Sequence, residues 1–396
     1  MNSAPITSIH TQSKIPATLH NNTHTHSDST NSTGFTLAQC YKMLALAAFL
    51  LAFVVVGLGA YTRLVHAGLG CPDWPGCYGH LTWPTSQQEI SAAEAKFPET
   101  PVELDKTWPE MVHRYFAGTL GLLVLAIVTV SVLNKKSNAK SQQPIKLPFL
   151  ILAIVIVQAA FGMWTVTLKL WPQVVTLHLL GGFTTLALLG LLNIKLNQER
   201  LFKHFSNYPA SDLPQQPNVK IIKRLSIICL LLVVTQISLG GWTAANYAAL
   251  PCHDFPTCQG TLWPTMDFKS GFNITQTIGP NYLGGQLDGP SRTAIHMSHR
   301  IGAGLVFLFC IPLIILLYRQ PFLKSSAVIL LSALTIQIAL GISNVVFITP
   351  LPVAILHNLF GVILLLSLIF CLSHLLYFKK FNLQSIQSDK NLSPRS

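Results

Sequence analysis

The chain has 396 residues, of which 50% are hydrophobic and only 10% are charged, and its mean hydropathy is +0.47. This composition excludes an ordinary soluble enzyme of that length and favours a protein embedded in a lipid bilayer. The formal net charge of +12 would suit nucleic-acid binding, but the basic residues lie between apolar segments, where they encode membrane orientation. No nucleic-acid partner is therefore expected.

The first segment, residues 1–42, is rich in Ser, Thr, Asn and His. Such a composition cannot bury enough apolar surface to fold alone, so it predicts a disordered cytoplasmic tail. A mitochondrial transit peptide is the competing interpretation. The segment contains no Arg before the first apolar run and shows no amphipathic stripe, which favours a bacterial inner membrane over the mitochondrial inner membrane.

Eight apolar runs of about twenty residues follow, each long enough to cross a hydrocarbon core of roughly 30 Å as a helix. They begin near residues 43, 112, 148, 174, 222, 294, 325 and 353. The prediction is an all-α membrane protein with eight transmembrane helices in two pseudo-symmetric four-helix bundles. The bundles span residues 43–194 and 222–378 and are joined by a cytoplasmic linker over 195–221, with a cytoplasmic tail over 379–396.

The basic residues set the predicted topology. Ten of the fourteen acids lie in the long loops after the first and fifth helices. The loops that carry most of the Lys and Arg join helices 2 and 3, 4 and 5, and 6 and 7, and the positive-inside rule places them in the cytoplasm. Both termini then lie in the cytoplasm, and the two long loops face outward.

Each outward loop contains a cysteine pair, Cys71 with Cys77 and Cys252 with Cys258. Because exported cysteines oxidise, two short-loop disulfides are predicted. Free thiols are one alternative. A zinc site that includes the nearby His80 and His253 is another.

The two halves repeat one another around their histidines. Glu110-x-x-His113-Arg114 in the first half matches His296-x-x-His299-Arg300 in the second, and Gln158 and Gln337 precede His178 and His357 by the same twenty residues. Equal spacing of this length indicates an internal duplication of a half-protein.

The four repeated histidines are the candidate metal ligands. Two neutral imidazoles from facing helices of a bundle suit a six-coordinate haem iron, so His113 with His178 and His299 with His357 predict two haem sites. Structural hydrogen bonding of the histidines is the alternative.

The arginine beside a ligand in each half, Arg114 or Arg300, is a candidate contact of a haem propionate, or it simply extends to the membrane interface. His296 is a candidate for a propionate contact or a proton shuttle, with a structural role as the alternative.

Glu110 is the main difference between the halves, since the second half has His296 at the matching position. It lies three residues before His113 and shares its helix face. A carboxylate there can move protons during oxidation of a substrate, so Glu110 is the candidate catalytic residue. An acid favoured by the dipole of a helix N-terminus is the alternative.

Residues 43–378 resemble the haem A synthase family through Glu110-x-x-His113-Arg114, the histidines His178, His299 and His357, and the string Cys71-Pro-Asp-Trp-Pro-Gly-Cys77. The resemblance implies an oxidoreductase that takes the C8 methyl of haem O to a formyl group through successive hydroxylations, giving haem A for terminal oxidases. It also implies haem b as a cofactor between His299 and His357, haem O as substrate between His113 and His178, and a disulfide from Cys71 to Cys77 over the substrate.

The implied partners are the haem O synthase (protohaem farnesyltransferase) and an electron acceptor. No nicotinamide or flavin fingerprint occurs in the sequence, so the acceptor is a quinone or a redox protein. A homo-oligomer is left open. Two other functions use the same ligands: a bis-haem b electron carrier or quinol oxidoreductase, and a haem transporter.

Overall fold

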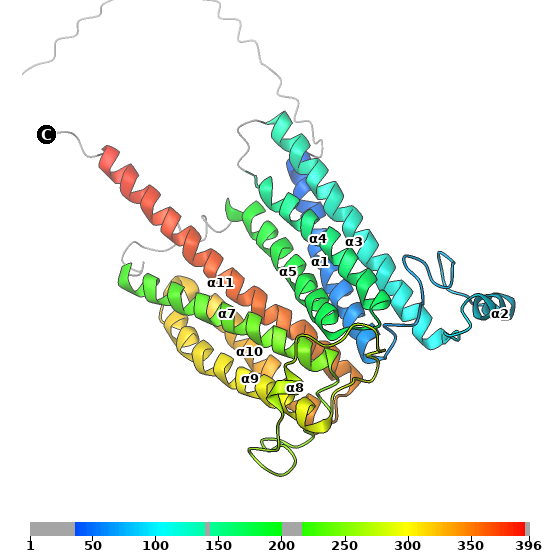
Figure 1. The fold of residues 1–396 in the computed structure, drawn as a ribbon. Coiled ribbons are helices and arrows are strands. Elements are labelled where there is room, and N and C mark those ends of the chain that lie inside the picture. The colour runs from blue at the N-terminus through cyan, green and yellow to red at the C-terminus, as the bar shows by residue number, and fades with distance from the viewer. Residues whose placement is uncertain (1–35, 139–142, 200–215, 393–396) are drawn as a thin grey trace, which may run out of the picture. The chain divides into compact units, whose positions relative to one another are not determined.

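The computed structural model describes residues 36–138, 143–199 and 216–392 (Figure 1). Nearly all of the predicted N-terminal tail and the central part of the predicted linker lie outside the described residues. No extended strand occurs in the described ranges, which contain only two isolated β-bridges, Cys77 with His80 and Cys258 with Thr261.

Eight long helices account for most of the described chain. They are α1 (Leu37–Leu64), α3 (Leu104–Ser137), α4 (Lys146–Thr167), α5 (Pro172–Leu196), α7 (Gln216–Ala245), α9 (Gly289–Tyr318), α10 (Lys324–Val346) and α11 (Leu351–Leu392). Each contains a stretch long and apolar enough to cross a membrane. The predicted number of spans is confirmed, and the chain is a multi-pass helical membrane protein.

Four of the eight helices, α1, α3, α7 and α9, begin five to eight residues before the predicted apolar runs, and polar capping residues start two of them. Thr36 and Gln39 form a capping box at the start of α1. At α9, the Asp288 side chain accepts the backbone N–H of Ser291 at 3.0 Å, and Pro290 occupies the first turn. These caps satisfy backbone donors that have no partner within the helix, so the starts of α1 and α9 follow capping rather than hydropathy.

The two long loops contain short helices that hydropathy did not predict. In the first loop, α2 (Gln87–Lys96) begins with a capping box of Ser86 and Glu89. In the second loop, α8 (Phe268–Gly271) is capped by Asp267. A third short element, the 3₁₀-helix η2 (Pro321–Leu323), precedes α10. Figure 1 shows α2 and α8 at the same end of the long helices, called here the loop end.

Helices pack mainly with others of the same half. α1 packs against α3 and α5, and α4 against α3 and α5, while α7 packs against α9 and α11, and α10 against α9 and α11. One buried apolar cluster fills the first group, with Tyr41, Ile127 and Leu186 at its centre. A second fills the other group around Leu313 and Leu330. The groups meet where α5 contacts α7 and where α11 contacts α1 and α5.

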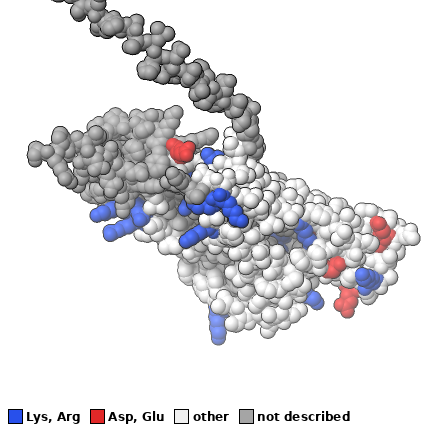
Figure 2. Space-filling model, turned by 90° about the horizontal axis from the view of Figure 1, so that it is seen from above, with Lys and Arg blue, Asp and Glu red and all other residues white. Residues whose placement is uncertain are grey.

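The charged side chains are unevenly placed. Figure 2 looks onto the end opposite the loop end, where Lys and Arg are spread over the visible face and most of the visible Asp and Glu lie at one edge. His374 of α11 lies near this end. Its ring is buried, and its Nδ1 lies 3.1 Å from Oγ of Ser326.

Candidate functional site

The structure brings each predicted histidine pair together. His113 of α3 faces His178 of α5 with ring centroids 6.5 Å apart, and His299 of α9 faces His357 of α11 with centroids 6.4 Å apart. The planes within each pair are nearly perpendicular, at 89° and 78°. The two histidines of a pair are up to 65 residues apart in the sequence. The four side chains therefore form two sites of similar geometry.

The residues fit a metal held between each pair. A metal–imidazole nitrogen bond is about 2 Å long, so two such bonds in line place the ring centres roughly 6 Å apart. Within the described residues, the buried Nδ1 atoms of His113, His178 and His357 make no well-formed hydrogen bond. The backbone carbonyls of Val55, Gln158 and Gln337 lie within weak hydrogen-bonding reach of these three rings. Such carbonyls are the usual outer partners that orient an imidazole bound to a metal through its other nitrogen.

Two of the four histidines lie more than two helical turns from the first residue of their helices. His113 follows the first residue of α3, Leu104, by nine positions, and His299 follows the first residue of α9, Gly289, by ten. At 1.5 Å per residue these rings lie about 14 Å along their helices. Both helices begin before their predicted apolar runs, which start near residues 112 and 294.

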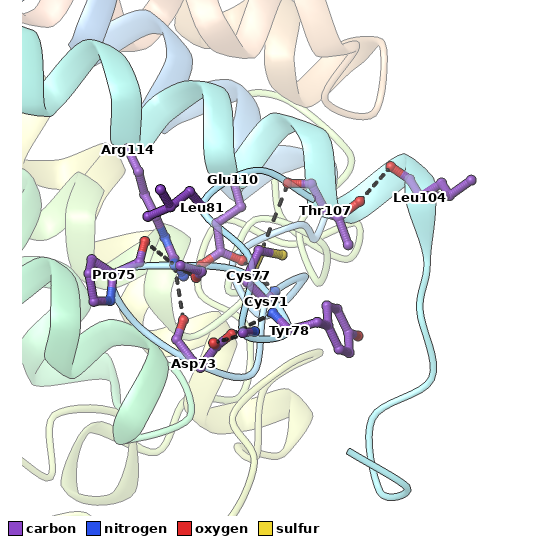
Figure 3. Close-up of a disulfide and its surroundings, with 12 residues drawn as sticks. Cys71, Asp73, Pro75, Cys77, Tyr78, Leu81, Leu104, Thr107, Glu110 and Arg114 are labelled. Atoms are coloured by element: carbon purple, nitrogen blue, oxygen red, sulfur yellow. Dashed lines mark hydrogen bonds and ion pairs between the residues drawn. A yellow bond between two sulfur atoms is a disulfide. The ribbon is translucent and has the colours of Figure 1, made fainter. Parts of the chain in front are cut away.

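Glu110 is buried and turned toward the first cysteine loop, as Figure 3 shows. Its Oε2 accepts the backbone N–H of Cys71 at 3.0 Å, and its Oε1 forms an ion pair with Nη2 of Arg114. The carboxylate thus connects the helix that carries His113 to the loop that begins at Cys71. Sequence spacing identified the residue but not these partners.

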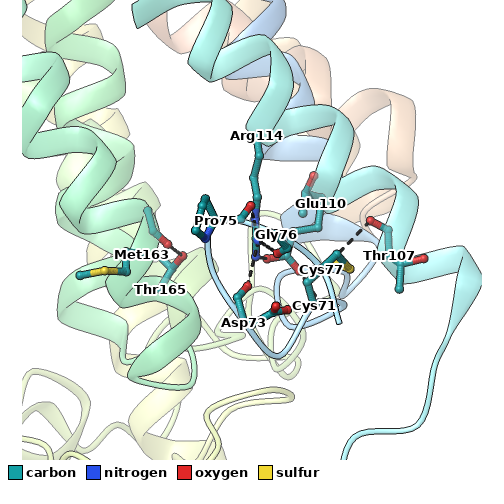
Figure 4. Close-up of polar contacts among 12 residues, drawn as sticks. Cys71, Asp73, Pro75, Gly76, Cys77, Thr107, Glu110, Arg114, Met163 and Thr165 are labelled. Carbon is teal, nitrogen blue, oxygen red and sulfur yellow. Dashed lines mark hydrogen bonds and ion pairs between the residues drawn. A yellow bond between two sulfur atoms is a disulfide. The ribbon is translucent and has the colours of Figure 1, made fainter. Parts of the chain in front are cut away.

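Arg114 closes the loop onto the helix. Its Nη1 donates to the backbone carbonyls of Asp73 at 2.9 Å and Gly76 at 2.5 Å. Figure 4 shows this guanidinium directed into the loop, with Met163 and Thr165 of α4 to one side. An arginine that gathers several carbonyls holds the loop in one position.

Arg300 does the same in the second half. Its guanidinium donates to the carbonyls of Thr257 at 2.8 Å and Asp254 at 2.9 Å. The predicted propionate contacts of both arginines remain predictions, and the structure adds a role in the loops that sequence reasoning missed. The sequence feature that could have indicated this role is the repeated Cys-x-Asp spacing, since Asp73 and Asp254 occupy matching positions in the two loops.

Those aspartates fix the turns. Asp73 accepts the backbone N–H groups of Tyr78 at 2.6 Å and Gly79 at 2.7 Å, and Asp254 accepts those of Gln259 at 2.8 Å and Gly260 at 2.9 Å. Hydrogen bonds from the Thr257 side chain and from these backbone groups lower the pKa of Asp254 to about 2. The turn therefore keeps its ionised carboxylate across the physiological pH range.

Both predicted disulfides are present. Cys71 is bonded to Cys77 with the Cα atoms 4.8 Å apart, and Cys252 to Cys258 with the Cα atoms 4.7 Å apart. The described residues contain no group of three or more His, Cys, Asp or Glu side chains that could hold a metal ion. In the structure, the loop cysteines are thus bonded to each other rather than arranged as a zinc site.

His296 occupies the position that Glu110 has in the first half, and it is also buried. Its Nδ1 lies 2.9 Å from the carbonyl oxygen of Ala248, in the segment that follows α7. The imidazole therefore contacts the loop end of its own half, as Glu110 does through Cys71. Its predicted contact with a propionate stays a prediction.

A polar contact between the halves was not predicted. Arg63 of α1 donates to the hydroxyl of Tyr247 at 2.6 Å and to the carbonyl of Ala244 at 2.7 Å, while His66 stacks on the Tyr247 ring at 5.5 Å between centroids. Desolvation and the positive charge of Arg63 lower the pKa of His66. The sequence signal is the position of Arg63, a cation at the loop end, where the positive-inside rule does not expect one.

The eight spans and the two facing pairs define a multi-pass helical membrane protein with two bis-histidine sites. Comparison with known proteins narrows this class. The family COX15-CtaA, described as "Cytochrome oxidase assembly protein", matches residues 42–369, and the chain belongs to this family.

Several curated relatives carry the name "Heme A synthase". One from Shewanella oneidensis is 43% identical over 316 residues, covering 80% of this chain and 91% of the relative. Relatives from Rickettsia akari and from the Wolbachia of Culex pipiens are 27% and 28% identical and cover 81% and 84% of this chain. The resemblance stated from the motifs is confirmed.

Proposed function

We propose that this protein is a haem A synthase, an oxidoreductase that converts the C8 methyl of haem O to the formyl group of haem A for terminal oxidases. The observation that carries the proposal is the pair of equivalent bis-histidine sites, of which, among the residues whose side chains the structure describes, only one has a buried carboxylate, Glu110, on the helix of a ligand. Membership of the family and the name of its relatives support it.

The two helix groups are two pseudo-symmetric halves with different duties. His113 and His178 would hold haem O as substrate, and His299 and His357 would hold a resident haem b. Bound there, haem b supplies one-electron transfer out of the substrate site. Both termini lie in the cytoplasm of a bacterial cell and the loop end faces outward, because Lys and Arg are concentrated between the helices at the opposite end.

The protein's own residues would accept protons and control access to the substrate site. Two hydroxylations with water as the oxygen source release four electrons and four protons from the methyl group and two water molecules together, and loss of one water then leaves the formyl group. The Glu110 carboxylate would accept protons, and its ion pair with Arg114 would stabilise its charged form. The electrons leave to a quinone or a redox protein. The loop closed by Cys71 and Cys77 covers this end of the bundle.

A difference beside the second ligand supports the assignment of the substrate to the first half. Next to His178, an open and largely apolar groove of about 370 Å³ lies between α4 and α5 and is bordered by Leu177, Gly181 and Gln158. Three residues after His357, the position equivalent to Gly181 is occupied by Phe360. The first half therefore has an apolar groove beside its second ligand at a position where the second half carries a phenyl ring. The groove of the second half, of about 230 Å³, lies elsewhere, between α7 and α9.

The groove beside His178 suits the farnesyl chain that distinguishes haem O from haem b. We expect Gly181→Phe, which copies the second half, to reduce haem O occupancy and haem A yield by at least about tenfold, since its ring would displace the Gln158 side chain that lies against Gly181 and would narrow the groove. Haem b at His299 and His357 is the internal control and should stay at the wild-type amount. An unchanged haem A yield would show that the farnesyl chain of haem O does not occupy the groove beside Gly181.

Pigment analysis tests the function itself. Membranes from cells that express this protein together with a haem O synthase are expected to yield extractable haem A, identified by its formyl group in chromatography and mass spectrometry. Cells with the synthase alone should yield haem O. Wild-type extracts that contain only haem B and haem O would instead support an electron carrier or a haem transporter.

A further inference from the structure

Each of the four candidate ligands rests against a glycine of a neighbouring helix. A methyl group added at Gly59 of α1 would lie 3.0 Å from Cε1 of His113, and one at Gly162 of α4 would lie 3.5 Å from Cε1 of His178. In the second half, methyl groups at Gly240 of α7 and Gly341 of α10 would each lie 3.1 Å from Cε1 of His299 and His357, respectively.

The nearest atom at each of these glycines is the same atom of the imidazole ring. General close packing of helices would bring a different kind of neighbour to each site, as it does at Gly241, where the nearest atom belongs to Thr176, or at Gly190, where it belongs to Leu366. Carbon atoms in favourable contact lie about 3.5–4.0 Å apart. Three of the four rings therefore occupy space that any side chain would remove.

The sequence around these glycines repeats as well. Gln precedes the glycine by four residues in Gln158-x-x-x-Gly162, Gln236-x-x-x-Gly240 and Gln337-x-x-x-Gly341, and Val55 takes that place before Gly59. Residues four apart lie on one helix face, so Gln and Gly face the same histidine helix. Gln236 shows this, because its amide donates to the carbonyl of His299 at 2.9 Å.

We propose that Gly59, Gly162, Gly240 and Gly341 are positioning residues that fix the imidazole planes of the four iron ligands. The inference rests on the proposed function in so far as the histidines bind haem. Bis-histidine ligation needs both rings aligned on one axis, and a displacement of a few tenths of an ångström at a ligand changes the strength of the ligand field at the metal. The absence of a side chain at these glycines is therefore needed for the position of the imidazole rings and not for helix formation.

Substitution with alanine tests the inference on the holoenzyme carrying two haems. Gly240→Ala and Gly341→Ala are expected to shift the low-spin electron paramagnetic resonance signal and the midpoint potential of haem b, and Gly59→Ala to shift those of the haem in the first half. Gly162→Ala should give the smallest shift, because its methyl group would already lie at a normal contact distance.

The other half of each variant provides the folding control, since its haem should keep the wild-type signal. Gly57→Ala on the same helix as Gly59 is the matched control. Its methyl group would lie 3.9 Å from Leu359 and would touch no histidine, so both signals should be unchanged. Wild-type protein without two low-spin haems would contradict the proposed function. Two wild-type haems whose signals are the same in all four alanine variants would overturn this inference alone.

Discussion

Glu110→Gln is expected to lower conversion of haem O to haem A by about 10²- to 10⁴-fold, the usual contribution of a positioned proton-transfer group. The amide keeps the size of the side chain and can still accept the N–H of Cys71, but it cannot take up a proton at neutral pH. Haem content should therefore remain at the wild-type level. Single-turnover conversion of bound haem O, followed by extraction, measures the effect.

Glu110→Asp separates proton transfer from the structural role of the ion pair with Arg114. It retains a carboxylate with a shorter reach, so we expect it to recover part of the rate that Gln loses. If the carboxylate only holds the cysteine loop, the loss of activity should instead follow a loss of haem O binding. Equal haem A yield from Glu110→Gln and wild type would remove Glu110 from the mechanism.

Replacing the histidine ligands should affect different properties in the two halves. His113→Ala or His178→Ala is expected to reduce haem A yield by at least about 100-fold, because removing a ligand exceeds the 10- to 100-fold losses typical of residues that only support one. Haem b should remain low-spin in both variants. Pigment extraction and electron paramagnetic resonance of the purified protein give the two measurements.

The reverse pattern is expected for His299→Ala and His357→Ala. These variants should lose the low-spin haem b signal while haem O still binds in the first half, and conversion should stop because electrons cannot leave. Product formation that continues without His113 or His178, or a haem b signal that depends on those two residues, would reverse or remove the assignment of the halves.

The chemistry-bearing residues could be found from the sequence because the duplication marks them. A histidine alone on an apolar helix has many explanations, whereas His113 and His299 share their neighbours, and His178 and His357 share a spacing to Gln158 and Gln337. Hydropathy gave the eight spans for a similar reason, since the length of an apolar run depends only on local composition.

The sequence by itself determined the membrane class, the number of spans, the paired histidines and the cysteine pairs, because each of these is written in local composition or in equal spacing. Only the tertiary structure decided which helix lies behind each histidine, that Arg114 gathers the carbonyls of Asp73 and Gly76, and that Arg63 reaches Tyr247. These contacts join residues between 16 and 184 positions apart. Such pairs depend on how the helices pack against one another, and the periodicity of a single helix does not determine that packing.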